Sequence, residues 1–178
     1  MPKLLAITGC MFSGKTNEFV KRVNCERARG RNVGIFKPNV DTRSSKILSR
    51  DGSSLEAEIL YTNSLPHLFY EKFLPYEVIA IDEVQFFPDT FLPEAIDELI
   101  DIKDFILSGL SRDFIGRPFG AMSKVLTMAD EIIQEYAICN MCKRGGATRT
   151  RRLSSDNSQI LVGLNMYEAN CAECYFKT

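Results

Sequence analysis

Short apolar runs alternate along most of the chain with segments in which apolar residues recur every three or four positions. The runs lie at 3–8, 33–37, 77–81, 105–110 and 131–138. Apolar residues at consecutive positions in runs this short are typical of strands that are buried on both faces of a sheet. The pattern therefore predicts five buried strands.

The segments between several of these runs show helical spacing. Residues 14–28 and 89–101 place their apolar side chains on one helical face, and 89–101 carries its acidic side chains on the opposite face. A third helix is predicted at 119–128, directly after a proline. Helices that alternate with strands predict an α/β fold whose mainly parallel sheet is covered on both faces.

Two stretches depart from this alternation. Residues 39–55 show no clear period and are rich in Ser, Asp and Arg, so we expect a mobile loop there. After residue 136, charges, glycines and paired cysteines dominate, and the apolar runs are too short to build a core alone. We predict a nucleotide-binding α/β domain at 1–136 and a small metal-held unit of short strands at 137–178.

Composition and charge narrow the class of protein. The 178 residues are 45% hydrophobic and 25% charged, with a formal net charge of -1, which is typical of a globular protein and does not favour a nucleic-acid partner. No apolar run approaches the roughly 18 residues that cross a bilayer, and the first residues lack the features of a secretory signal. We expect a cytoplasmic protein without a membrane partner, whose cysteines stay reduced.

The first strand runs into a phosphate-binding motif. Residues 9–16 match the P-loop pattern G-x-x-x-x-G-K-[ST], between a predicted strand and a predicted helix. The glycines let backbone N–H groups surround phosphate oxygens, the Lys adds charge, and the Thr hydroxyl is a ligand for Mg²⁺. We therefore predict that ATP and Mg²⁺ bind at Gly9, Cys10, Met11, Phe12, Ser13, Gly14, Lys15 and Thr16.

A second acidic motif follows the third strand. Asp82 ends the apolar run and is predicted to hold Mg²⁺ together with Thr16, while the adjacent Glu83 is placed to accept a proton from an attacking oxygen. We count Asp82, Glu83, Val84 and Gln85 among the ATP-binding residues. These motifs alone do not identify the attacking group, because water would give an ATPase and a hydroxyl a kinase.

The tail contains two C-x-x-C pairs. Cys139, Cys142, Cys171 and Cys174 have the spacing of a structural tetrahedral Zn²⁺ site. Cys10 and Cys25 lie apart from these pairs and are expected to be ordinary thiols, with Cys10 reactive because it lies near a helix N-terminus.

Five basic residues cluster between the two cysteine pairs. A zinc ribbon with such a cluster would suit phosphate backbones, but a solvated face or a subunit contact is the favoured interpretation at this net charge. The residues are Lys143, Arg144, Arg149, Arg151 and Arg152. The single histidine, His67, has no partner nearby in the sequence and is expected on the surface or in a helix.

Four segments together resemble the type II thymidine kinases. They are the loop at 9–16, the D-E-x-Q-F-F strand end at 82–89, the G-L-x-x-D-F-x-G-x-P-F-G segment at 109–120 and the D-x-R loop at 41–43. The resemblance implies a RecA-like nucleotide domain with a zinc-binding lasso that closes over thymidine, and transfer of the γ-phosphate of ATP to the 5′-hydroxyl. It also implies a homotetramer, inhibition by dTTP, and Glu83 as the base.

The resemblance also assigns residues to the nucleoside. It implies a thymine pocket walled by Met11, Phe86, Leu110, Phe114 and Phe119, with Thr150, Ile160, Leu161, Val162, Gly163 and Tyr167 around the pyrimidine. The lasso at 162–167 is one residue shorter than the family pattern and lacks its second glycine. Either Arg43 or Arg117 is expected to assist phosphoryl transfer.

Two other functions fit part of the sequence. One is a zinc-ribbon P-loop ATPase that acts on nucleic acid, and the other is a kinase for a different nucleoside. The segment 109–120 and Tyr167 argue against the ATPase, since neither has a role in a motor of this size.

Overall fold

A six-stranded parallel sheet forms the centre of the computed structural model, which describes residues 3–42, 44, 46–49, 51–155, 158–161, 163 and 165–177. Its strand order is β5-β2-β6-β7-β1-β8, and every neighbouring pair is parallel. The strands are β1 (Leu4–Gly9), β2 (Val33–Pro38), β5 (Glu58–Leu60), β6 (Val78–Ile81), β7 (Asp104–Gly109) and β8 (Glu131–Glu135). The predicted α/β class with a parallel sheet is confirmed.

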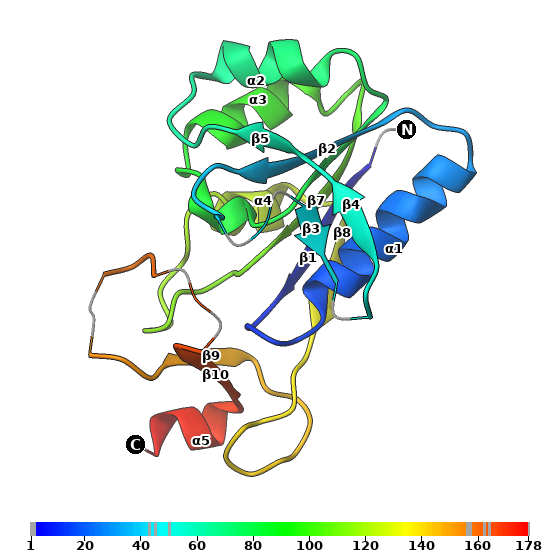
Figure 1. The fold of residues 1–178 in the computed structure, drawn as a ribbon. Coiled ribbons are helices and arrows are strands. Elements are labelled where there is room, and N and C mark those ends of the chain that lie inside the picture. The colour runs from blue at the N-terminus through cyan, green and yellow to red at the C-terminus, as the bar shows by residue number, and fades with distance from the viewer. Residues whose placement is uncertain are drawn as a thin grey trace.

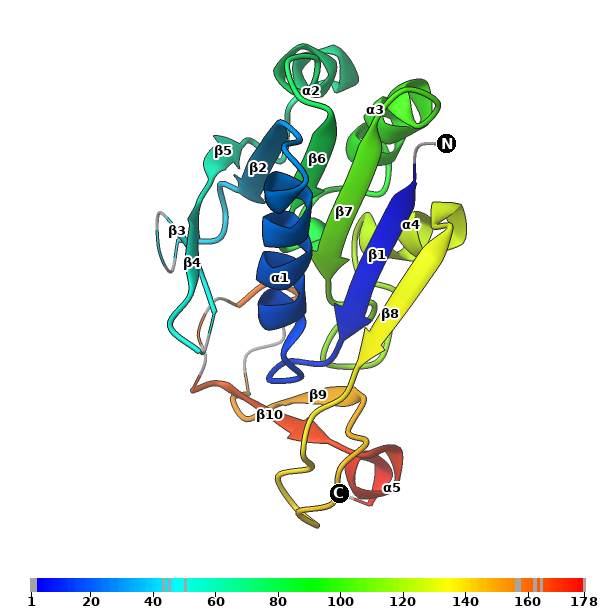
Figure 2. The ribbon, with the colours of Figure 1, turned by 90° about the vertical axis from the view of Figure 1, so that its right-hand side faces the viewer.

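Helices cover both faces of this sheet. Helix α1 (Lys15–Ala28) lies on one face, and α2 (Pro66–Phe73), α3 (Phe91–Leu99) and α4 (Met122–Met128) lie on the other (Figure 2). On the second face, the ring of Phe73 from α2 contacts the rings of Phe36 from β2 and Phe105 from β7. Burial on both faces explains why β1, β2, β6 and β7 appear as continuous apolar runs. The edge strand β8 has no fully buried residue, so the prediction that it is buried was wrong.

The segment expected to be a mobile loop contains an antiparallel strand pair, so that expectation was wrong for the residues described there. Strands β3 (Lys46–Leu48) and β4 (Ser54–Glu56) pair with each other, and Ile47 and Leu55 are buried against the α1 side of the sheet. Each strand buries a single residue, which is too little for a periodic signal. The buried Lys37 and Asp41 form an ion pair at 2.8 Å just before this hairpin.

The C-terminal segment forms a small unit at the carboxyl ends of β1 and β8 (Figure 1). It contains the antiparallel strands β9 (Arg149–Arg152) and β10 (Tyr167–Asn170), followed by α5 (Ala172–Phe176). The short strands were predicted and the helix was not. No helix among the described residues is long and apolar enough to span a membrane.

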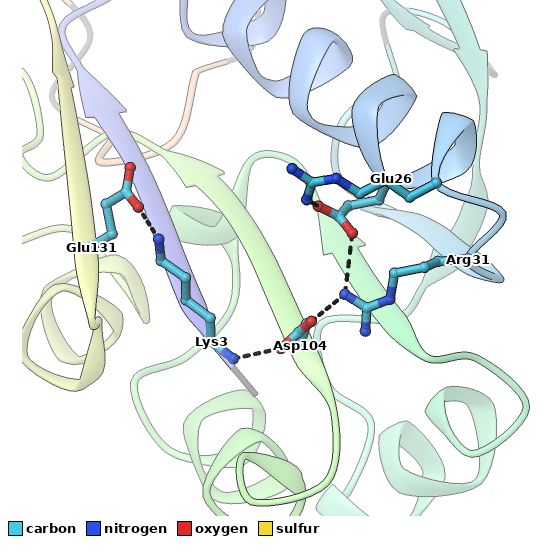
Figure 3. Close-up of polar contacts among 6 residues, drawn as sticks. Lys3, Glu26, Arg31, Asp104 and Glu131 are labelled. Carbon is cyan, nitrogen blue, oxygen red and sulfur yellow. Dashed lines mark hydrogen bonds and ion pairs between the residues drawn. The ribbon is translucent and has the colours of Figure 1, made fainter. Parts of the chain in front are cut away.

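The opposite end of the sheet carries a polar network (Figure 3). Lys3 bonds to Glu131 through its ammonium and to Asp104 through its backbone N–H, and Arg31 reaches both Asp104 and Glu26. These contacts join the amino ends of β1, β7 and β8 to the end of α1. Partly exposed ion pairs of this kind each contribute little stability, about 0–1 kcal/mol. The network lies away from the carboxyl edge, where ligands of parallel sheets bind.

Candidate active site

The loop between β1 and α1 has the strained backbone of a phosphate cradle. Gly14 has φ 96° and Phe12 has φ 68°, both in the left-handed region. A side chain at Gly9 would bring its Cβ within 2.5 Å of the Glu135 carbonyl oxygen. Glycine is therefore required at Gly9 by the close approach of β8, and at Gly14 by the turn into the helix.

Polar groups of this loop point toward a ligand. The Lys15 ammonium donates to the Cys10 carbonyl oxygen at 2.9 Å, which holds the ammonium over the loop. The Ser13 hydroxyl is buried and has no hydrogen-bond partner among the described residues. A buried polar atom without a partner needs an explanation, and a phosphate oxygen at the loop would supply one.

Two adjacent carboxylates, those of Asp82 and Glu83, lie between β6 and the short 3-10 helix η1 (Val84–Phe86). Glu83 adopts φ 56°, an uncommon conformation for a residue with a side chain. Gln85 is buried and bridges two groups: its Nε2 donates to Glu83 Oε2 at 2.6 Å, and its Oε1 accepts from the Leu110 N–H at 2.9 Å. Gln85 therefore orients the Glu83 carboxylate and ties it to the start of the next loop.

The buried Asp82 is held close to Glu83. Its Oδ1 accepts from the Glu83 N–H at 2.9 Å. Burial, and then the neighbouring Glu83 carboxylate, raise the pKa of Asp82 to about 7. A bound cation would oppose both effects by favouring the ionised form of Asp82.

These groups border one cavity. Its phosphate end is lined by Gly14, Lys15, Thr16, Asp82 and Glu83, and its far end by aromatic and apolar side chains. The lining contains ten of the residues predicted to contact the nucleoside: Met11, Phe86, Leu110, Phe114, Phe119, Thr150, Ile160, Leu161, Gly163 and Tyr167. The eleventh, Val162, lies outside the described residues. Val84 does not line the cavity, because its side chain is fully buried in the core.

The loop that follows β7 forms one wall of the cavity. Phe86 and Phe119 meet edge to face, with ring centroids 6.0 Å apart. Asp113 braces the turn, because its Oδ1 accepts from the Ile115 and Arg117 N–H groups at 3.1 and 2.9 Å. The wall is therefore preorganised by its own hydrogen bonds.

Four cysteine sulfurs meet in the small unit. Those of Cys139, Cys142, Cys171 and Cys174 all lie within 4.8 Å of one another. Zn–S bonds of about 2.3 Å in a tetrahedron place sulfurs about 3.8 Å apart, so the group fits Zn²⁺ with little adjustment. Two cysteines come from each end of the unit, which is the arrangement of a closed structural site.

The surroundings of the four sulfurs shift their pKa values in different directions. Backbone N–H groups, the Cys142 N–H first among them, lower the pKa of Cys139 to about 6, and the Arg144 side chain lowers the pKa of Cys142. Hydrogen bonding to Cys171, followed by burial, raises the pKa of Cys174 to about 12. Metal-binding cysteines must be deprotonated, and a bound cation would favour all four thiolates, so the metal assignment rests on the distances between the sulfurs.

The small unit contacts the phosphate loop directly. The Cys10 thiol donates to the Ala147 carbonyl oxygen at 3.3 Å, and the Met11 N–H donates to Thr150 Oγ1 at 3.0 Å. Cys10 is buried among small residues of this unit, and its burial raises the pKa of its thiol. The expectation that Cys10 is reactive was therefore wrong, because burial outweighs the nearby Lys15 and the helix N-terminus.

Most members of the basic cluster are engaged inside the small unit. Arg151 contacts Glu168 and Arg144 contacts Glu173, while Arg149 lies over the rings of Tyr175 and Phe176. Arg152 is buried and lines the cavity. The interpretation of the cluster as a solvated face was therefore wrong for Arg152, and an open phosphate-binding surface is equally unsupported.

Sequence reasoning missed several cavity residues. They are Asn17, Leu48, Arg112, Asp113, Arg152 and Gln159. Arg112 and Asp113 lie inside a segment already singled out, whereas Leu48 belongs to the unforeseen hairpin. Of the two arginines expected near the phosphates, Arg117 is exposed and not part of the cavity lining, and Arg43 lies outside the described residues.

Comparison with known proteins identifies the family of the chain. The family model described as thymidine kinase matches residues 2–175. The chain is 35% identical to a thymidine kinase of Pyrobaculum aerophilum over 97% of both chains. It is 38% identical to one of Thermococcus kodakarensis, covering 96% of this chain and 92% of the relative. A Bacteroides thetaiotaomicron thymidine kinase is 33% identical over 98% of this chain and 87% of its own. Matches of this extent show that the chain belongs to the thymidine kinase family.

Proposed function

We propose that this protein transfers the γ-phosphate of ATP to the 5′-hydroxyl of thymidine, as a salvage enzyme that forms dTMP. The observation that carries the proposal is the single cavity with a phosphate loop at one end and an apolar, aromatic wall at the other. Such a wall suits a planar base with a methyl group. Both ends are bordered by residues that match the family motifs.

Glu83 is the proposed general base. Its carboxylate lines the cavity and is oriented by the hydrogen bond from Gln85. A carboxylate aimed at the attacking hydroxyl contributes by positioning it and by accepting its proton. Lys15 is placed to neutralise charge on the transferring phosphoryl group, as phosphoryl transfer requires. Arg112 joins Arg43 as a candidate for the assisting arginine, because it lines the cavity.

Two metal ions are part of this proposal. Thr16 and Asp82 would hold Mg²⁺, which neutralises phosphate charge when it is bound. The four cysteines would hold Zn²⁺ in a structural role. Residues 137–178 are proposed to act as a lasso domain that closes over the nucleoside, distinct from the nucleotide domain at 1–136.

Further properties rest on the family alone. We propose a cytoplasmic homotetramer that is inhibited by dTTP and has no nucleic-acid partner. The contacts of Arg149 and Arg151 inside the small unit support the last point, because they reduce the positive charge that this cluster exposes. We therefore do not propose the nucleic-acid ATPase as a second function.

The experiment that tests the proposal measures phosphoryl transfer from Mg-ATP to each common nucleoside, with a control lacking nucleoside. We expect strong transfer to thymidine and weak background hydrolysis. Hydrolysis of ATP that is indifferent to nucleosides would contradict the proposal, and preferential transfer to another nucleoside would change the substrate.

Glu83→Gln tests the proposed base. The substitution keeps the size of the side chain but removes its ability to accept a proton, so we expect kcat to fall by about 10²–10⁴. ATP affinity should change little, and it is measured separately by equilibrium binding. Near-normal turnover in this variant would exclude Glu83 as the base.

A further inference from the structure

Phe114, a residue of the cavity wall, is held by two groups of the small C-terminal unit. The residue belongs to the loop after β7, whereas both groups that hold it belong to the C-terminal segment. Its ring and its backbone are contacted separately. Within a wall whose turn is braced by Asp113, Phe114 is therefore also held by a part of the chain that lies far away in the sequence.

The first of these groups is the Arg152 guanidinium. Its central carbon lies 3.7 Å from the centroid of the Phe114 ring, within the distance of a strong cation–π contact. The same guanidinium donates to the Tyr167 hydroxyl at 2.7 Å and to the Gln159 carbonyl oxygen at 3.2 Å. The Tyr167 hydroxyl in turn donates to the Leu161 carbonyl oxygen at 2.8 Å. Arg152 thus joins the aromatic wall to the segment that borders the opposite side of the cavity.

The second group is the Tyr175 hydroxyl. It donates to the Phe114 carbonyl oxygen at 2.6 Å, from helix α5. Tyr175 directly follows Cys174, the last cysteine of the four-sulfur cluster. A metal that fixes the cysteines would therefore also fix the position of this hydroxyl.

We propose that Arg152 and Tyr175 are positioning residues that fix Phe114 and so determine how tightly the nucleoside base binds. The inference rests on the proposed function, since it assumes that the base lies against this wall. Neither residue is assigned a part in phosphoryl transfer. Loss of either contact should weaken nucleoside binding while it leaves the phosphate end of the cavity unchanged, because Lys15, Asp82 and Glu83 are held by other bonds.

Tyr175→Phe removes one oxygen atom and the hydrogen bond it makes. We expect the KM for thymidine to rise about fivefold, the value that corresponds to one hydrogen bond. The kcat and the KM for ATP should stay within about twofold, since the contact does not reach the phosphate end. Tyr136→Phe is the matched control, because Tyr136 is exposed.

Arg152→Lys keeps the charge but removes the planar group that stacks on Phe114 and donates to three oxygens, those of Ser158, Gln159 and Tyr167. We expect the KM for thymidine to rise by about tenfold or more, with Arg27→Lys on the exposed surface of α1 as the control. Thymidine binding measured by calorimetry without ATP should weaken by the same factor. Bound zinc per chain and the melting temperature should match the wild type for Tyr175→Phe, which separates positioning from general loss of structure.

The outcomes distinguish this inference from the proposed function. If the wild type binds thymidine and Tyr175→Phe and Arg152→Lys bind it equally well, the inference is wrong and the proposed function stands. If the KM for ATP rises as much as the KM for thymidine, the residues are only structural and the inference is again wrong. If the wild type binds no thymidine, the proposed function fails and the inference fails with it.

Discussion

The sheet domain and the small C-terminal unit differ in the kind of core that stabilises them. The sheet domain buries large side chains, among them Phe36, Phe69, Phe73, Phe87 and Phe105, on both sides of six strands. Among the described residues of the small unit, the buried apolar side chains are those of alanines and cysteines, and Cys10 and Phe12 of the phosphate loop pack against them. Buried apolar area contributes about 25 cal/mol per Å², so this core contributes much less than that of the sheet domain, and the proposed Zn²⁺ would supply stability that the small core lacks.

The residues that line the cavity also come from these two parts of the chain. The phosphate loop and the carboxylates belong to the sheet domain, whereas Thr150, Arg152 and Tyr167 come from the small unit. The groups proposed for phosphoryl transfer thus lie on the part with the large core, and those proposed to close the cavity lie on the part with the cysteine cluster. Nucleoside binding should therefore be more sensitive to metal loss than the fold of the sheet.

Removal of the proposed Zn²⁺ is expected to have the largest effect, a loss of thymidine phosphorylation. A chelator, or Cys142→Ser, should lower thymidine phosphorylation by at least about 100-fold, because metal binding and folding are coupled in such small units. Far-UV circular dichroism should keep most of its signal, since the sheet domain does not contain the cysteine cluster. Cys25→Ser is the control, as Cys25 is exposed and outside the cluster. Full activity with no bound metal would contradict the division between the two parts.

A substitution that opens a cavity in the aromatic core tests whether this core is the main source of stability. Phe105→Ala removes a fully buried ring from β7 and should lower the free energy of unfolding by about 3–5 kcal/mol. Chemical denaturation measures this change, and Ile132→Ala on the exposed face of β8 should cost far less. An equal cost for the two substitutions would show that the sheet core is not the main source of stability.

Asp82→Asn is expected to raise the stability of the fold, by less than Phe105→Ala lowers it. The pKa of Asp82 is about 7 in the folded chain, against an ordinary value of 3.8. Ionisation of Asp82 therefore disfavours the folded state. Stability is lost as the pH rises from about 4 to about 7. Without Mg²⁺ or ATP, the neutral Asn should raise the melting temperature at pH 8 by about 2–4 °C for each kcal/mol gained. The gain should shrink toward pH 4, where Asp82 is protonated. A lower melting temperature at pH 8 would contradict the cost assigned to burying this carboxylate.

Much of the sheet domain was predictable from the sequence. The buried strands appear as apolar runs, and the helix at Phe91–Leu99 shows a clear polar and apolar face. The hairpin at Lys46–Leu48 and Ser54–Glu56 was missed because each of its strands buries one residue. Helix α5 was missed because five residues are too few for a helical period.

The site was predictable in its motifs and less so in its contacts. The phosphate loop, the two carboxylates and the four cysteines follow from spacing, which encodes local geometry. The position of Arg152 depends on how distant segments pack, and its sequence neighbours suggested only a charged surface. The environment of Cys10 was wrongly predicted for the same reason, since the residues that bury it come from the other end of the chain.

The contacts between the phosphate loop and the small unit have a consequence for synthesis on the ribosome. Cys10 and Met11 are synthesised well before their partners Ala147 and Thr150, which follow 137 and 139 residues later. At about 5–20 residues per second, that interval lasts many seconds. The nascent chain can thus complete its parallel sheet while the loop still lacks its last partners. Nucleotide binding by the emerging polypeptide should therefore mature only after the C-terminal cysteines leave the exit tunnel.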